Sequence, residues 1–162
     1  MSETYYVKTF GGLEITNDNV TVNIVELFGK QLVNLLQVLL FHSEKPVQKD
    51  ELIDILWPES KNPSSALKFS IFRLRSELNE IDFFKDKEVI VTTRKGYILN
   101  PNLDWNIDFV ELQKAYNQIN EGAELLDEKE LDYIKDVFML HQASFIGFYK
   151  NKKYLDKCML KQ

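Results

Sequence analysis

The sequence predicts an α+β fold, and changes of pattern along the chain support this prediction. Residues 5–27 are rich in β-forming side chains that alternate with polar ones, which is typical of a small antiparallel sheet. Residues 30–78 instead repeat their apolar side chains at helical spacing. The alternating pattern returns for one hairpin after residue 88, and helical spacing resumes from residue 108.

Three short strands are expected near the N-terminus, over Tyr5–Phe10, Leu13–Thr16 and Val20–Leu27. Turn-forming sequences separate them, Gly11-Gly12 first and then Asn17-Asp18-Asn19. Because both connections are short, neighbouring strands are predicted to pair antiparallel.

Three helices are predicted next. The first spans Lys30–His42, where five leucines at helical spacing indicate a position at the centre of the core. The second spans about Gln48–Leu56 and ends at Trp57, because a residue that precedes proline avoids the α region. The third spans Asn62–Asn79 and begins with Asn-Pro, a favourable N-cap followed by a favourable first residue. Its buried stripe is predicted to be Leu67, Ile71, Leu74 and Leu78.

A hairpin follows, with strands over Glu88–Thr93 and Tyr97–Asn100 joined by the basic turn Arg94-Lys95-Gly96. The order of sheet, three helices and hairpin is that of a winged helix-turn-helix. In that fold the second helix braces the third, and the third enters the major groove of DNA. The hairpin is the wing, which reaches an adjacent backbone or minor groove.

The rest of the chain is predicted to be helical. Pro101–Trp105 is interpreted as a linker, and helices are expected over Asp108–Glu121, Glu128–Leu140 and Tyr149–Lys161. Two antiparallel helices of this length resemble one tetratricopeptide-like unit. Residues 1–100 are therefore assigned to the winged helix-turn-helix domain and residues 101–162 to a second, helical domain.

Several sequence runs resemble one family of regulators. FGGLEI at 10–15, KDELIDILWPES at 49–60 and FRLRSEL at 72–78 resemble the DNA-binding half of the Streptomyces antibiotic regulatory protein (SARP) family, an OmpR-type winged helix. NIDFVELQKAY at 106–116 and MLHQASFIGFY at 139–149 are similar to the bacterial transcriptional activator domain that follows it. The resemblance covers nearly the whole chain, and that second domain, usually longer in the family, is expected to be partial here. It implies a regulator that binds direct repeats in double-stranded DNA as a homodimer and contacts RNA polymerase.

The face of the third helix opposite its buried stripe is the candidate DNA-binding surface. At 100° per residue, this face and its flanks carry Ser65, Lys68, Phe69, Phe72, Arg73, Arg75 and Ser76. The resemblance implies base-reading or phosphate-contacting roles for Ser65, Phe69, Phe72, Arg73 and Arg75.

Arg73 is expected to contact a base or a phosphate, because a guanidinium can bond O6 and N7 of guanine together. Arg75 and Lys68 are expected to hold phosphates, which fixes the register without reading the sequence. The alternative is a solvated basic face with intrahelical ion pairs, such as one between Arg73 and Glu77.

The two phenylalanines on this face form an apolar patch, and such patches indicate contact with another molecule. Phe69 is expected to press on a thymine methyl group. Phe72 has two interpretations of equal weight, a second methyl contact or packing against a neighbouring element or a partner subunit.

Further contacts are expected at the wing tip and at the start of the third helix. Arg94 or Lys95 is expected to approach the minor groove, and Thr93 to bond a phosphate; an ordinary solvated hairpin tip is the alternative. Ser64 and Ser65 would help the first backbone amides of the helix to hold a phosphate.

The charge distribution leaves two classes of function open. The net charge is −5, which is unfavourable for a protein that must neutralise phosphates. Residues 61–79 nevertheless hold four basic side chains against Glu77 alone, a net charge of +3. The rival hypothesis is a winged-helix protein-interaction module that does not bind DNA, and the net acidity, Ser65 and Phe72 favour it.

The sequence contains no pattern that indicates an enzyme, a metal site or a cofactor. His42 and His141 are far apart, Cys158 has no cysteine partner, and no phosphate-binding glycine loop is present. No run approaches the roughly 18 apolar residues of a membrane helix, and the N-terminus does not resemble a signal peptide. A cytoplasmic location without membrane contact is therefore expected.

Overall fold

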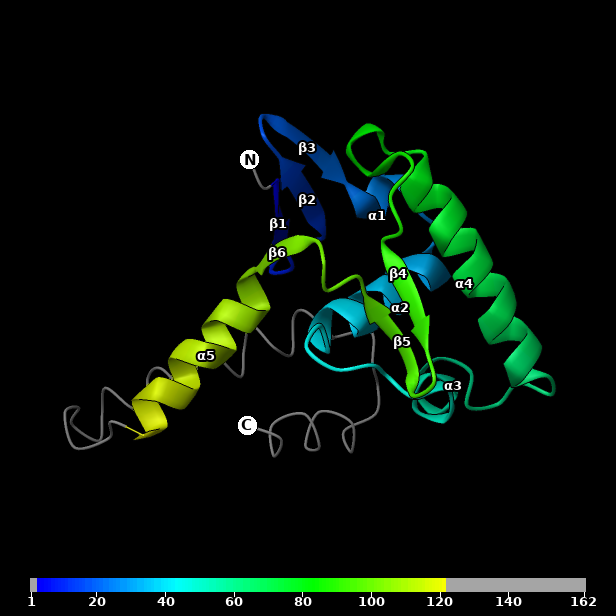
Figure 1. Cartoon of the computed structure of the whole chain (residues 1–162). Coiled ribbons are helices and arrows are strands. Elements are labelled where there is room, and N and C mark those ends of the chain that lie inside the picture. Colours follow the sequence, from blue (N-terminus) through cyan, green and yellow to red (C-terminus); the bar gives the residue numbers. More distant parts are fainter. Residues whose placement is uncertain (1–2, 122–162) are drawn as a thin grey trace.

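The computed structural model describes residues 3–121, so the helices predicted over 128–140 and 149–161 lie outside the described residues. The elements follow the predicted order of sheet, helices and hairpin (Figure 1). They are β1 (Thr4–Lys8), β2 (Glu14–Asn17), β3 (Val20–Asn23), α1 (Ile24–Leu27), α2 (Lys30–Phe41), α3 (Lys49–Leu56), α4 (Pro63–Asn79), the 3-10 turn η1 (Asp82–Phe84), β4 (Ile90–Thr93), β5 (Gly96–Leu99), β6 (Asp104–Ile107) and α5 (Asp108–Glu121). The predicted α+β winged helix-turn-helix is confirmed.

The N-terminal sheet has four strands, in the order β3-β2-β1-β6. Its first three strands pair antiparallel as predicted, and β6 adds a parallel neighbour to β1, with Thr4 opposite Asp104. The linker predicted over Pro101–Trp105 is therefore wrong at its end, where Asp104 and Trp105 belong to β6.

The predicted third strand, Val20–Leu27, is also wrong in its second half. Residues 24–27 form the single helical turn α1 instead. The side chain of Asn23 accepts a hydrogen bond from the backbone N–H of Glu26, at 3.3 Å, and so caps this turn.

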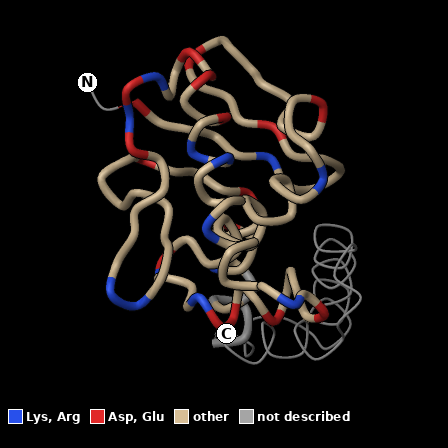
Figure 2. The backbone as a smooth tube through the Cα atoms, turned by 90° about the vertical axis from the view of Figure 1, so that its right-hand side faces the viewer, with Lys and Arg blue, Asp and Glu red and all other residues tan. Residues whose placement is uncertain are grey.

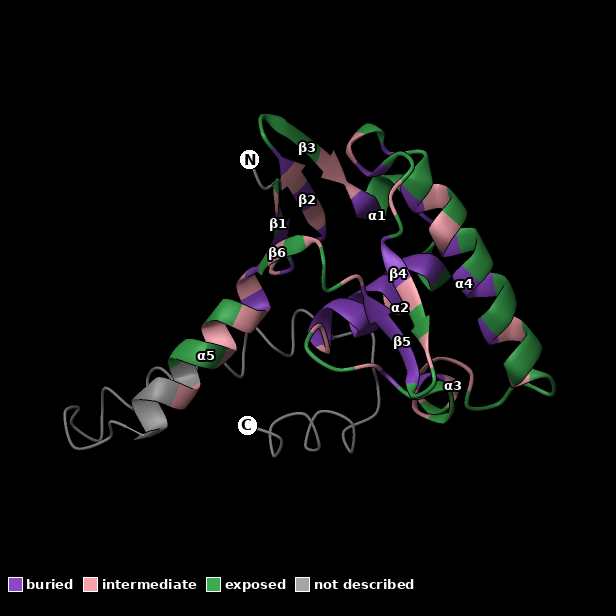
Figure 3. Ribbon diagram, in the orientation of Figure 1, coloured by how far each residue is buried: buried purple, intermediate pink, exposed green. Residues whose placement is uncertain are grey.

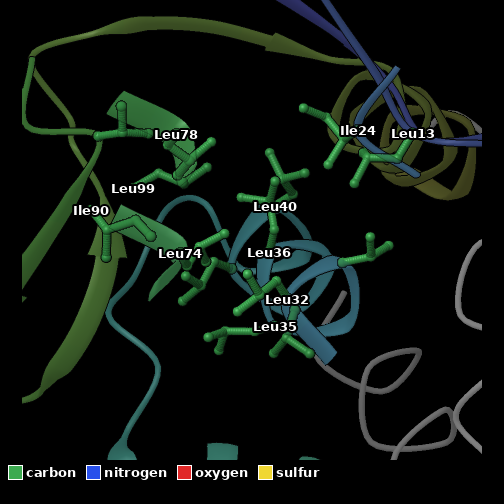
Figure 4. Close-up of a cluster of buried hydrophobic side chains, with 14 of the residues drawn as sticks. Leu13, Ile24, Leu32, Leu35, Leu36, Leu40, Leu74, Leu78, Ile90 and Leu99 are labelled. Atoms are coloured by element: carbon green, nitrogen blue, oxygen red, sulfur yellow. The ribbon is translucent and has the colours of Figure 1, made fainter. Parts of the chain in front are cut away.

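Helix α2 lies at the centre of the core, as its leucine pattern predicts. Nine of its twelve residues are buried, so it contacts other elements on nearly every side. Figure 4 shows its leucines close to Leu74 of α4, with Ile90 and Leu99 of the hairpin beside them. The predicted stripe of α4 is confirmed, because Leu67, Ile71, Leu74 and Leu78 are all buried. Each such side chain contributes about 1.5–3 kcal/mol by leaving water.

The base of α5 is fixed to this body. Asp108, its first residue, accepts hydrogen bonds from the backbone N–H groups of Thr9, at 2.9–3.0 Å, and Phe10, at 3.4 Å, and from the Thr9 hydroxyl. The next residue, Phe109, is fully buried and stacks on Phe41 of α2 with ring centroids 4.1 Å apart. The helix then projects from the body (Figure 1).

The connection between α2 and α3 supports the hairpin β4–β5. Val47 exchanges two backbone hydrogen bonds with Tyr97 of β5, with N–O distances of 2.8 and 3.0 Å. Gly96 crosses so close to this connection that a Cβ there would lie 1.9 Å from the carbonyl oxygen of Val47. The hairpin is therefore held by backbone contacts next to its tip, at Gly96 and Tyr97, the first two residues of β5.

A polar and aromatic cluster joins β1 to the segment before the hairpin. The ring of Tyr5 lies among Phe83, Phe84 and Trp105, with centroid distances of 4.8–5.9 Å. Lys87 forms an ion pair with Glu3 and donates a hydrogen bond to the Tyr5 hydroxyl at 2.6 Å. The first strand is thus attached to a part of the chain about eighty residues away.

None of the helices described between residues 3 and 121 has the length and apolar character needed to cross a membrane.

Candidate nucleic-acid interface

The outer face of α4 is open to solvent along its length, as its green outer surface in Figure 3 shows. The predicted residues Ser64, Ser65, Lys68, Phe69, Phe72 and Arg73 are all exposed. The phenylalanines are 62% and 71% exposed, values far outside the range of core residues. The sequence therefore predicted correctly which side chains of this helix face outward.

The start of α4 differs in one detail from the expected cap. Asn62 occupies the N-cap position and Pro63 is the first helical residue, as predicted. However, the Asn62 side chain makes no capping hydrogen bond. Among the described residues, the backbone amide groups of the first turn, which contains Ser64 and Ser65, therefore have no side-chain cap.

Arg73 keeps its charge uncompensated. The three ion pairs recorded among residues 3–121 are Lys8–Glu14, Lys87–Glu3 and Lys114–Glu111, so the intrahelical pair of Arg73 with Glu77 is not formed. The guanidinium lies 5.9 Å from the centroid of the Phe69 ring instead. A cation–π contact of this kind holds the charge beside the apolar patch without neutralising it.

Arg75 has a structural contact that sequence reasoning missed. Its Nε and Nη2 atoms donate to the carbonyl oxygen of Ile90, at 3.2 and 3.0 Å, and Nη2 also donates to the hydroxyl of Thr92 at 2.7 Å. Arg75 thereby ties α4 to strand β4. Its place on the flank, next to buried Leu74, was the available signal. A phosphate contact for Arg75 stays a prediction.

The wing tip presents two exposed cations, Arg94 and Lys95. The hydroxyl of Thr93 closes the turn, since it accepts from the N–H groups of Lys95 and Gly96, at 3.1 and 3.2 Å, and donates to the Gly96 carbonyl at 3.0 Å. Thr93 therefore shapes the tip, and its predicted phosphate contact stays a prediction.

The start of the basic segment 61–76 and the tip of the hairpin lie at one end of the molecule. Figure 1 shows the first turn of α4 and the tip of the hairpin at the same end, with α3 between them. Residues 61–76 carry Lys61, Lys68, Arg73 and Arg75 without an acidic side chain. Figure 2 looks onto the side where α4 lies, with Lys and Arg along it and many Asp and Glu at its upper end. Exposed acidic side chains also lie near this end, among them Asp50 and Asp54 of α3 and Glu59 just before α4.

Other kinds of site have little support among residues 3–121. Within residues 3–121, no three His, Cys, Asp or Glu side chains are grouped so that they could hold a metal ion. His42 lines a cleft of about 520 Å³ between the α2–α3 connection and α5, and its ring packs against Phe41 with centroids 5.3 Å apart. His141 and Cys158 lie outside the described residues.

Comparison with protein families points the same way as the geometry. Residues 23–99 match the family described as "Transcriptional regulatory protein, C terminal". This is a family of OmpR-type winged-helix DNA-binding domains. This match supports the OmpR-type class predicted from the sequence for these residues, whereas the SARP resemblance and the activator domain stay predictions.

Two solved structures are similar to this chain. One is the "DNA binding domain of E. coli CadC", with 25% identity and a TM-score of 0.43 over 60% of this chain and 94% of that chain. The other is "Mycobacterium tuberculosis EmbR in complex with low affinity phosphopeptide", with 19% identity and a TM-score of 0.49 over 93% of this chain and 37% of that chain. The comparison with curated proteins finds no match.

Proposed function

We propose that this chain is a sequence-specific, DNA-binding transcriptional regulator. Helix α4 enters the major groove, and the hairpin β4–β5 lies against the adjacent backbone or minor groove. The observation that carries the proposal is the outer face of α4, whose cations form no ion pair within residues 3–121 and whose first turn lies at the same end of the molecule as the basic wing tip. A 17-residue helix is about 25 Å long, enough to follow a groove about 12 Å wide.

Each proposed contact has a distinct role. Arg73 bonds a guanine edge or a phosphate, and Lys68 holds a phosphate, which sets the register. Arg94 and Lys95 reach the neighbouring backbone or minor groove. Ser64 and Ser65 stand beside amide groups that no side chain caps, where a phosphate oxygen would accept hydrogen bonds.

The net acidity is compatible with this function because charge distribution decides how a protein approaches DNA. The basic end attracts phosphates, while the acidic side chains elsewhere repel them and so orient the molecule. A single module of this type buries little area on DNA. We therefore propose that two copies bind together.

The remaining parts of the proposal follow from the sequence. Residues 1–100 form the DNA-binding domain, and residues 101–162 begin an activator domain that contacts RNA polymerase. The chain acts in the cytoplasm, where bacterial DNA is, and works by binding rather than by catalysis.

A second candidate is a winged-helix module that binds another protein. The observation in its favour is the exposure of Phe69 and Phe72, 62% and 71%, in a chain of net charge −5. Such an interface would depend on the phenylalanines and resist salt, whereas phosphate contacts weaken steeply with salt.

The test is selection from a pool of random duplex DNA at about 50 and 200 mM salt. The parent is expected to enrich one sequence, with affinity falling roughly 10²-fold between the two salts if about four phosphates are contacted. Arg73→Ala is expected to lose the enrichment. Lys85→Ala removes the same charge beside η1 and is expected to retain it.

Absence of binding by the folded parent at low salt would overturn the proposal. Equal losses in Arg73→Ala and Lys85→Ala would show a charge effect without a specific surface.

A further inference from the structure

We infer that Phe69 and Phe72 act as thymine readers, so that the preferred DNA site has thymines at two neighbouring base-pair steps next to the group that Arg73 contacts. This inference rests on the proposed function, because it concerns the same face of α4. It names the chemical feature that this face recognises, the C5-methyl group of thymine in the major groove.

The two rings lie where base edges would be met. They are one helical turn apart on the outer face, with Ser65 before them and Ser76 after them on the same stripe. Both are mostly exposed, so neither contributes to the core that α4 shares with α2. The central part of the exposed face is therefore apolar.

A phenyl ring can read only one kind of base edge. Thymine presents a methyl group beside its O4 acceptor in the major groove, whereas guanine, adenine and cytosine present hydrogen-bonding groups there and no methyl group. A ring placed over those polar groups would remove water from them and offer no hydrogen bond in return, which is unfavourable. The phenylalanine pair therefore favours thymine and disfavours the alternatives.

The spacing of the rings determines how the thymines are arranged. Positions three residues apart on a helix differ by about 4.5 Å along its axis. Successive base pairs are about 3.4 Å apart. The two rings thus match methyl groups on neighbouring steps.

The charges around the rings favour DNA over a protein as the occupant. The exposed Lys68 and Arg73 neighbour Phe69 and Phe72 in the sequence of α4, the exposed Lys61 precedes the helix, and no Asp or Glu lies between residues 61 and 76. This arrangement complements a polyanion with apolar groups between its charged strands. The guanidinium of Arg73, 5.9 Å from the Phe69 ring, lies next to the first methyl position.

The test replaces thymidine by deoxyuridine in the DNA sequence that the parent protein selects. This change removes a methyl group and leaves the hydrogen-bonding groups unchanged. At two neighbouring positions, each replacement is expected to weaken binding by the parent about fourfold, the effect of one buried methyl group. Replacements outside those positions are expected to have no effect.

The variants Phe69→Ala and Phe72→Ala identify which ring meets which methyl group. In each variant, replacing thymidine by deoxyuridine is expected to have no effect on affinity at one of the two positions. At the other position the replacement is expected to weaken binding as it does for the parent. Tyr6→Ala, which removes an exposed ring from the N-terminal sheet, is the control and is expected to keep both discriminations.

The outcomes separate this inference from the proposed function. A selected site without thymines, or a parent that binds both duplexes equally, overturns the thymine readers and leaves DNA binding intact. Absence of any selected DNA overturns both. Salt-resistant binding of a protein that the phenylalanine variants abolish, without methyl discrimination on DNA, assigns the patch to a protein partner and overturns the inference.

Discussion

At position 96 the backbone leaves no room for a side chain. A Cβ there would lie 1.9 Å from the carbonyl oxygen of Val47 and 2.6 Å from its carbonyl carbon. The φ angle of 141° is one that glycine adopts and other residues avoid. The close approach exists because Val47 and Tyr97 exchange backbone hydrogen bonds, so it cannot relax without opening the contact that supports the wing.

Gly96→Ala is therefore expected to lower the free energy of unfolding by about 2 kcal/mol or more, measured by urea denaturation. Gly29→Ala is the matched control, because an added Cβ meets nothing within 4 Å and φ is −66°. It is expected to change stability by less than about 1 kcal/mol. Equal losses in the two variants would contradict the steric explanation.

At the scale of elements, the position of the wing relative to α4 depends on Arg75. Its three hydrogen bonds join the flank of α4 to β4, and its guanidinium also lies 6.0 Å from the Tyr97 ring of β5. One side chain of the helix proposed to enter the groove therefore holds both strands of the hairpin beside it.

Arg75→Met keeps much of the side-chain stem and removes every donor. It is expected to lower the free energy of unfolding by about 1–3 kcal/mol, the range for lost hydrogen bonds to a charged group, and to weaken DNA binding. Lys68→Met removes the same charge from an exposed position of α4. It is expected to weaken DNA binding with stability unchanged within about 0.5 kcal/mol. Denaturation and DNA titration of both variants test this, and a stable Arg75→Met would contradict it.

Helix α3 gives a second prediction at this scale, with the opposite sign. Helix α3 is the first helix of the helix-turn-helix, the one that crosses the DNA backbone in this motif. It exposes Asp50 and Asp54. Asp54→Asn is expected to raise DNA affinity several-fold at about 50 mM salt, with a smaller gain at 200 mM because salt screens repulsion. Asp82→Asn in η1 is the control, with no gain expected by fluorescence anisotropy. Equal gains in both would indicate a net-charge effect.

At the scale of the whole molecule, Glu3, Tyr5 and Lys87 connect the N-terminal strand to the segment before the wing. The hydrogen bond from Lys87 lowers the pKa of Glu3 below its usual 4.5. The same bond to Glu3, helped by Tyr5, raises the pKa of Lys87 above 10.5. Burial raises the pKa of Tyr5 above 10.0.

These shifts determine how stability depends on pH. Glu3 stabilises the fold above pH 4.5, and this contribution is lost as pH falls through its lowered pKa. Lys87 stabilises the fold below pH 10.5, and this contribution is lost as pH rises through its raised pKa. Lys87→Met is expected to reduce both the acidic and the alkaline loss of stability, measured as urea midpoints at a series of pH values that spans the two pKa values. Lys8→Met breaks an exposed ion pair with Glu14 at 3.9 Å and is expected to leave both losses of stability unchanged. If Lys87→Met keeps both pH-dependent losses of stability, they do not come from the Glu3–Lys87 pair.

Local sequence patterns indicate which side chains of one element are buried, but not which distant elements they contact. The bounds predicted for α5 are those observed, and the buried stripe of α4 is confirmed, because helical spacing reports burial within a few turns. Strand β6 was missed because its four residues carry no local signal and their partner is about a hundred residues away. The bonds of Arg75 to β4 were missed for the same reason. Exposure was predictable for the candidate site residues other than Arg75 and Thr93, which are half-buried. Contacts with DNA depend on a molecule outside the chain.

The pairing of β1 with β6 has a consequence for how the protein forms on the ribosome. Thr4 lies opposite Asp104, so β1 leaves the ribosome about a hundred residues before its partner β6. Strands β1 to β3 can pair with each other soon after they emerge, but one edge of β1 stays open until residue 107 is available. Contacts this distant in sequence slow folding. Synthesis of the intervening helices and hairpin therefore precedes closure of the sheet, and the N-terminal strand is among the last parts to be completed.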